Sequence, residues 1–156
     1  MMAAEETASV ADGPVKKEIS GMKELTIEAT PENVDKVIGF VDEMLEEYGC
    51  GTKEQMAIDV AVDELFGNIA HYAYNPETGY ATVKVDVIQN PLSVEITFVD
   101  HGKPYDPLAK ADPDTTQSIE DRPIGGMGIL IVKKSMDAVN YEYRDGKNIL
   151  TIKKNI

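Results

Sequence analysis

The stretch Gly125-Gly126-Met127-Gly128-Ile129 is a glycine-rich turn that runs directly into the apolar segment Leu130-Ile131-Val132. Glycine loses more backbone entropy on folding than any other residue, so a cluster needs a reason such as positive φ or the close approach of another molecule. The apolar residues after the turn predict a helix over residues 129–136. Because a helix N-terminus presents unpaired N–H groups and partial positive charge, the turn is either a flexible connection or the cover of a bound phosphate.

The composition is that of one acidic globular domain. The 156 residues are enough for one core and too few for two, and apolar (42%) and charged (28%) residues occur at ordinary levels. The formal charge of −13 argues against nucleic acid as a partner, because its phosphates attract Lys and Arg. No apolar run approaches the roughly 18 residues of a membrane span, and no secretion signal is recognisable. The single cysteine, Cys50, fits a reducing compartment, so we expect a cytoplasmic protein without membrane contact.

Hydrophobic periodicity divides the chain into helices and strands. Residues 1–21 are polar and aperiodic, so we expect a mobile tail before one domain over residues 22–156. Alternating apolar residues predict strands over residues 22–29, 80–89, 92–100, 138–144 and 147–154. Apolar residues spaced by three and four predict helices over residues 31–48 and 53–73. For the first helix we expect Thr30 as the N-cap and Asn33 at the capping-box position.

The second predicted helix carries two stripes of residues. Its core stripe consists of Ile58, Val62, Leu65 and Ile69. A second stripe, about a quarter turn away, consists of Ala57, Ala61, Glu64, Asn68 and His71. The small residues leave room beside the Glu64 carboxylate and the Asn68 carboxamide, so this stripe is either a solvated polar patch or a ligand-binding surface.

The strand over residues 92–100 ends at Asp100-His101-Gly102-Lys103-Pro104, after which apolar periodicity is absent as far as Pro123. A structureless connection of this length in a small domain is usually functional or mobile. We interpret it as a lid over a site.

Three of these clusters together resemble the motifs of the histidine-kinase-type (Bergerat) ATPases. Glu64-Leu65-Phe66-Gly67-Asn68 is similar to the N-box, Asp100-His101-Gly102 to the first glycine box and Gly125-Gly126-Met127-Gly128 to the second, in matching order and spacing. The runs His71-Tyr72-Ala73-Tyr74 and Pro104-Tyr105-Asp106-Pro107 further resemble the anti-sigma regulatory factors with serine/threonine kinase activity. The resemblance covers roughly Met22 to the C-terminus.

The resemblance implies an α+β fold: a two-layer sandwich in which a mixed, mostly antiparallel sheet carries helices on one face. It also implies a site for ATP and Mg²⁺. Asn68 would bind the metal ion through its carbonyl oxygen, and Glu64 would act as the general base. Asp100 would accept a hydrogen bond from the adenine amino group, with Gly102 allowing close approach. The phosphates would be covered by Gly125, Gly126, Met127, Gly128 and Ile129.

The implied function is that of an ATP-dependent serine/threonine kinase, an anti-sigma regulatory factor of a bacterial partner-switching system. It would phosphorylate an anti-sigma-factor antagonist, with a sigma factor and a second copy of the chain as further partners. Met127 departs from the pattern, because members often carry Arg there, so the charge on the phosphates would come from Arg122 or Lys103 or be missing. No phosphoacceptor helix precedes the N-box, which argues against a complete sensor histidine kinase.

Two alternatives to a kinase follow from the same motifs. A binding module would hold nucleotide only to shape a surface that sequesters a sigma factor or another regulator, with little or no transfer. An ATPase domain of the superfamily would only hydrolyse ATP. Glu64 favours the kinase over the binding module, because a module that merely binds nucleotide needs no base.

Overall fold

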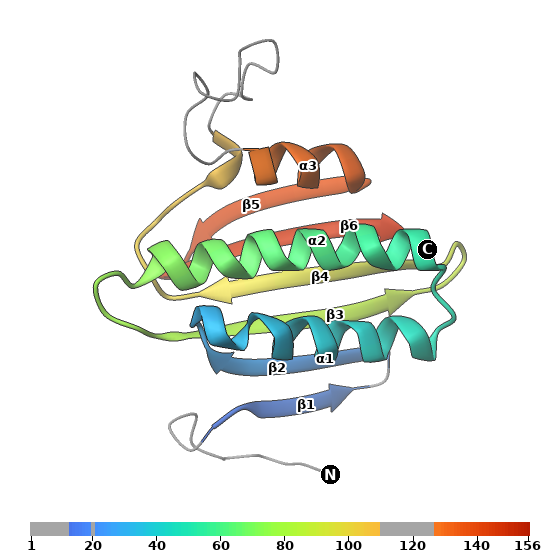
Figure 1. The fold of residues 1–156 in the computed structure, drawn as a ribbon, viewed down its shortest axis with the longest axis horizontal. Coiled ribbons are helices and arrows are strands. Elements are labelled where there is room, and N and C mark those ends of the chain that lie inside the picture. The colour runs from blue at the N-terminus through green and yellow to red at the C-terminus, as the bar shows by residue number, and fades with distance from the viewer. Residues whose placement is uncertain (1–12, 20, 110–126) are drawn as a thin grey trace.

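The computed structural model describes residues 13–19, 21–109 and 127–156. In this part of the chain, six strands form one open sheet in the order β1-β2-β3-β4-β6-β5 (Figure 1). The strands are β1 (Val15–Ile19), β2 (Met22–Glu28), β3 (Tyr80–Ile88), β4 (Ser93–Asp100), β5 (Ala138–Arg144) and β6 (Lys147–Asn155). All described pairings are antiparallel, where a mixed, mostly antiparallel sheet was expected. The predicted α+β fold is confirmed.

The helices form a second layer on one face of the sheet, with α2 between the other two (Figure 1). They are α1 (Val34–Glu47), α2 (Thr52–Asn68) and α3 (Met127–Ser135). A short 3-10 turn, η2 (Pro31–Asn33), leads into α1, and a π-helical turn, η3 (Ile69–Ala73), ends α2. None of the helices in the described residues is long and apolar enough to cross a bilayer.

The core lies between the two layers. The apolar face of each strand packs against the apolar stripes of the helices, as the periodicities predicted. The fully buried side chains include Val37 and Val41 of α1, Ile58, Val62 and Phe66 of α2, Val83 and Val85 of β3, Ile96 of β4 and Ile152 of β6. The other face of the sheet is polar: hydroxyl pairs join Thr26 to Thr82 (2.8 Å) and Thr97 to Thr151 (3.3 Å) across neighbouring strands. The sheet therefore has one core face.

Two local features differ from the sequence-based expectations. Residues Val15–Ile19, expected within a tail, form β1 at the edge of the sheet, where the pairing depends on backbone hydrogen bonds with β2 rather than on an apolar face. The Thr30 side chain makes no cap hydrogen bond. The Asn33 Nδ2 atom instead donates to the Glu28 carbonyl oxygen over 2.8 Å, so Asn33 fastens the start of α1 to the end of β2.

The last hairpin has the predicted turn. Asp145 and Gly146 both adopt positive φ, of 55° and 76°, which a two-residue turn between twisted strands requires. This hairpin places β6 beside β4 in the sheet.

Asp42 of α1 and Asp59 of α2 meet between the two helices. The pKa of Asp59 is raised from 3.8 to about 7. Burial is the largest cause, and smaller contributions come from the hydrogen bond with Asp42 and from the negative charges of Asp42 and Glu46. Among the described residues, the Oδ1 atoms of both aspartates are buried without a hydrogen-bond partner. Two carboxyl groups in this arrangement are stable when they share a proton.

This pair predicts a loss of stability as the pH rises. Because the pKa of Asp59 is higher in the folded state, folding binds a proton between the two pKa values, so the stabilisation is complete below about pH 4 and is lost as the pH rises through about 7. Asp59→Asn is expected to remove most of this pH dependence. Urea unfolding at several pH values measures it, with exposed Asp63→Asn on the same helix as the control. A pH dependence in Asp59→Asn equal to that of the wild type would refute the shared proton.

Candidate functional site

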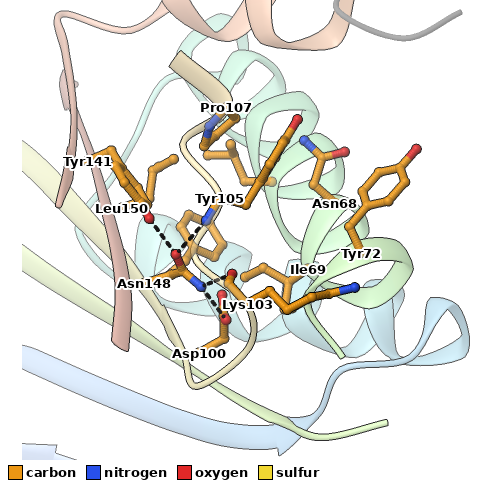
Figure 2. Close-up of a pocket in the computed structure, with 13 residues that line it drawn as sticks. Asn68, Ile69, Tyr72, Asp100, Lys103, Tyr105, Pro107, Tyr141, Asn148 and Leu150 are labelled. Atoms are coloured by element: carbon orange, nitrogen blue, oxygen red, sulfur yellow. Dashed lines mark hydrogen bonds between the residues drawn. The ribbon is translucent and has the colours of Figure 1, made fainter. Parts of the chain in front are cut away.

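A pocket lies between the C-terminal part of α2, the end of β4 and the start of β6 (Figure 2). It holds about 470 Å³ of empty space, including its open mouth. Its walls are apolar, from Leu65, Ile69, Phe98 and Leu150, and polar groups of Asp100 and Asn148 lie at one end. Apolar walls with a few convergent polar groups are typical of a small-molecule site.

Asp100 lies at the C-terminal end of β4 and is only 4% exposed. Its Oδ1 atom accepts hydrogen bonds from the Gly102 backbone N–H (2.8 Å) and from Asn148 Nδ2 (2.9 Å). Burial raises the pKa of Asp100, and the hydrogen bonds from Asn148 and Gly102 together with the charge of His101 oppose that rise. The predicted adenine-binding residue is therefore a buried carboxyl group that neighbouring donors hold in place.

Gly102 packs directly against the π-helical turn at the end of α2. A Cβ atom at residue 102 would lie 2.3 Å from the Ala73 carbonyl oxygen, closer than any side chain allows. The next backbone N–H, that of Lys103, donates to the same oxygen over 3.0 Å. The glycine thus lets the first glycine box approach the N-box helix, and the contact falls on a π-helical turn, a feature frequent at functional sites.

Tyr74 connects this turn to the two central strands. Its hydroxyl donates to the Tyr80 carbonyl oxygen (2.7 Å) and accepts from the His101 backbone N–H (2.8 Å). The motif residue Tyr74 therefore fixes where the N-box helix ends relative to the strand end that carries Asp100.

Glu64 and Asn68 are separated by one turn of α2 but lie in different surroundings. Asn68 lines the pocket, whereas Glu64 is absent from its lining. Glu64 instead lies against the first turn of α3: a Cβ atom at Gly128 would be 2.0 Å from the Glu64 carboxylate carbon. The structure thus brings the N-box and the end of the second glycine box together. Both residues also border a shallow groove between α2 and the start of α1.

The remaining predicted site residues have different outcomes. Gly125, Gly126 and Arg122 lie outside the described residues. Met127 begins α3, two residues before the predicted start, and is half-buried, whereas the Ile129 side chain is part of the core. Only the backbone of Ile129 is therefore available to contact a ligand.

Two further candidates are placed by the structure. Lys103 lines the pocket, and its Nζ atom donates to the Asn75 carbonyl oxygen over 3.2 Å. His71 is exposed, with its ring 6.1 Å from that of Tyr72. His71 is absent from the lining of the pocket that ends at Asp100.

Sequence reasoning missed Asn148, Tyr141 and the aromatic rim formed by Tyr72 and Tyr105, whose rings are 6.3 Å apart. Asn148 had a recognisable signal. It has the same strand parity as the inward-facing residues Leu150 and Ile152, so it is a polar residue at a core-facing position. Such a position is rarely polar without a function.

The donor set fits a magnesium ion that arrives with its nucleotide. The described residues contain no group of three or more His, Cys, Asp or Glu side chains able to hold a metal. Asn68 offers one hard carbonyl oxygen at the pocket. Mg²⁺ keeps several waters and commonly takes one or two protein ligands plus substrate phosphates, so one ligand of this kind suits it.

Comparison with known proteins identifies the family. Residues 27–154 match the histidine kinase-like ATPase domain, and the chain belongs to this family. Over 99 residues it is 30% identical to serine/threonine-protein kinase BtrW of Bordetella bronchiseptica, and the aligned region covers 63% of this chain and 68% of BtrW. Over 102 residues it is 31% identical to the anti-sigma F factors of Caldanaerobacter subterraneus and of Thermoanaerobacter sp., covering 64% of this chain and 68% of each factor. Membership in an ATPase family implies that the chain binds ATP.

Proposed function

We propose that this protein is an ATP- and Mg²⁺-dependent serine/threonine kinase, an anti-sigma regulatory factor that phosphorylates an anti-sigma-factor antagonist in a partner-switching system. The observation that carries the proposal is the placement of two groups on α2: Asn68 lines the pocket that ends at Asp100, and Glu64 lies beside the first turn of α3. The names of the relatives, a serine/threonine kinase and anti-sigma F factors, support the same reading.

The adenine would lie in the pocket, between the apolar walls that α2 and the sheet provide. Asp100 would accept a hydrogen bond from the adenine amino group, since its carboxyl group faces the pocket from the end of β4. This buried contact would make the site selective for adenine, because a base without a donor group at that ring position leaves an acceptor oxygen of Asp100 unpaired.

The phosphates would then extend from the pocket toward Asn68 and the start of α3. Asn68 would hold the magnesium ion, which supplies charge stabilisation at the phosphate oxygens when bound. The first-turn N–H groups of α3, at Met127 and Gly128, have no partners within the helix and suit an anionic group. Backbone groups of Gly125 and Gly126 would complete the cover.

Glu64 would act as the general base. Its carboxylate is half-buried beside Gly128, one helical turn from Asn68, and also borders the shallow groove on α2. In the reaction, a serine or threonine hydroxyl oxygen of the antagonist forms a bond to the γ-phosphorus, its proton passes to Glu64, and ADP leaves.

Asn68→Ala is expected to lose the part of the ATP affinity that depends on Mg²⁺, a decrease of at least about tenfold when the ion is present. The remaining apolar and adenine contacts should keep a weaker, metal-independent affinity. Calorimetric titration of ATP with and without Mg²⁺ measures both values, and His71→Ala, an exposed change on the same helical stripe, is the control. Equal gains from Mg²⁺ in Asn68→Ala and in the wild type would exclude Asn68 as the metal ligand.

A second candidate function is a nucleotide-dependent binding module that holds a sigma factor or another regulator and transfers phosphate slowly or not at all. Met127 favours it, because a methionine supplies no positive charge to the phosphates at the start of α3. From the family resemblance, we propose three partners for this chain: the antagonist, a sigma factor and a second copy of the chain.

A further inference from the structure

We propose that Asn148 is the positioning residue for adenine recognition. Its carboxamide holds the Asp100 carboxylate and the loop after β4 in the one geometry that accepts the adenine amino group. This inference rests on the proposed ATP site and adds the residue that gives that site its selectivity among nucleobases.

Asn148 lies on β6 directly opposite Asp100 on β4, and its side chain is buried, with the residue 6% exposed. Its Nδ2 atom donates to Asp100 Oδ1 (2.9 Å) and to the Lys103 carbonyl oxygen (2.8 Å). Its Oδ1 atom accepts from the Tyr105 backbone N–H (3.1 Å) and from the Tyr141 hydroxyl. Figure 2 shows these bonds converging on Asn148 from β4, from the loop after it and from β5.

The chemistry of these bonds requires a carboxamide. The acceptors, on Asp100, Lys103 and, at the longer distance of 3.5 Å, Gly102, all face the amide nitrogen. The donors, on Tyr105 and Tyr141, face the amide oxygen. Rotating the amide by half a turn would break all of these bonds, so its orientation is fixed. Aspartate at this position would oppose Asp100 with a second acceptor, and alanine would leave these buried groups without partners.

The network determines which oxygen of Asp100 meets the ligand. Asn148 and Gly102 both donate to Oδ1, and among the hydrogen bonds of the described residues none involves Oδ2. In this orientation the Oδ2 atom of Asp100 remains able to accept a hydrogen bond from a ligand in the pocket. An adenine amino group supplies that donor, whereas the carbonyl group of hypoxanthine at the same ring position is repelled. Asn148 should therefore control the preference for ATP over ITP.

The same side chain also fixes the loop that lines the pocket. Its bonds to the Lys103 carbonyl oxygen and the Tyr105 N–H hold a segment whose side chains form part of the pocket wall. Base recognition and pocket shape thus depend on one buried group.

The test compares the affinities of Asn148→Ala and the wild type for ATP and for ITP by calorimetry. We expect the variant to lose about tenfold or more in ATP affinity and much less in ITP affinity, because a hydrogen bond to a charged group is lost only with adenine. Asn148→Asp, which keeps the side-chain shape, should lose the preference as well and serves if the alanine variant fails to fold. Asn140→Ala, an exposed change on β5, is the matched control.

The pH dependence of ATP affinity gives a second readout. Without the Asn148 donor the pKa of Asp100 should rise, so the variant should reach its full ATP affinity only at a higher pH than the wild type. Among the described residues, the other titratable groups around Asp100 are His101, Tyr74, Tyr141 and Lys103, and the substitution leaves all four of these residues in the sequence.

The outcomes separate this inference from the proposed function. Folded Asn148 variants that bind both nucleotides with equally reduced affinity, or that keep the wild-type ratio of ATP affinity to ITP affinity, would overturn the positioning role. The proposed ATP site would not be affected by that result. A wild type that binds neither nucleotide would overturn the proposed function itself.

Discussion

Replacing Glu64 with Gln is expected to lower phosphoryl transfer to the antagonist by on the order of a hundredfold or more while ATP affinity stays nearly unchanged. Glutamine has the same shape and keeps the contact with Gly128, but its amide cannot take a proton from the attacking hydroxyl. ATP affinity should survive because Glu64 is not among the residues that line the pocket. Initial rates of transfer from labelled ATP, together with calorimetric titration of ATP, measure the two quantities.

Asp63→Asn is the control for this experiment, since it makes a similar change on the neighbouring, exposed residue of α2. It should leave transfer close to the wild-type rate. Undiminished transfer in Glu64→Gln would remove Glu64 from the mechanism, and a loss of ATP affinity equal to the loss of transfer would make it a binding residue instead.

Replacing Gly102 with Ala is expected to lower the free energy of unfolding by about 1–3 kcal/mol and to weaken ATP binding by at least about tenfold. The added Cβ would lie 2.3 Å from the oxygen and 2.6 Å from the carbonyl carbon of Ala73. Because both are backbone atoms, the π-helical turn or the end of β4 must move, and Asp100 moves with it. Urea unfolding and ATP titration measure the two effects.

Gly39→Ala in α1 is the matched control, because a Cβ atom there meets no atom within 4 Å. It should stabilise the fold by about 0.5–1 kcal/mol through the higher helix propensity of alanine, with no effect on ATP affinity. Wild-type stability and ATP affinity in Gly102→Ala would show that the close approach to Ala73 is not needed.

Most of the fold was predictable from the sequence because its periodicities are long and regular. The α2 core stripe, the β3–β4 hairpin and the Asp145-Gly146 turn all appear where the pattern placed them. The β1 strand was missed because an edge strand held by backbone hydrogen bonds leaves no apolar alternation in the sequence. The π-helical turn after Asn68 was missed because it continues α2 without a break, and a local change in backbone hydrogen bonding leaves no signal in the spacing of apolar residues.

The candidate site was predictable in its motifs but not in its geometry. Helical spacing predicted that Glu64 and Asn68 share a stripe, yet only tertiary packing decides that Asn68 lines the pocket while Glu64 lies against Gly128. The role proposed for Asn148 depends on the pairing of β4 with β6, which brings Asn148 opposite Asp100. A pairing between distant segments leaves no signal in local periodicity.

The most direct test of the proposed kinase is transfer of labelled phosphate from ATP, with Mg²⁺, to an anti-sigma-factor antagonist protein from the same organism. Transfer to a serine or threonine of that protein, identified by mass spectrometry, is the predicted result, and it should disappear in Glu64→Gln. ATP bound at saturation without any labelled antagonist would contradict the kinase and leave the nucleotide-binding module as the function.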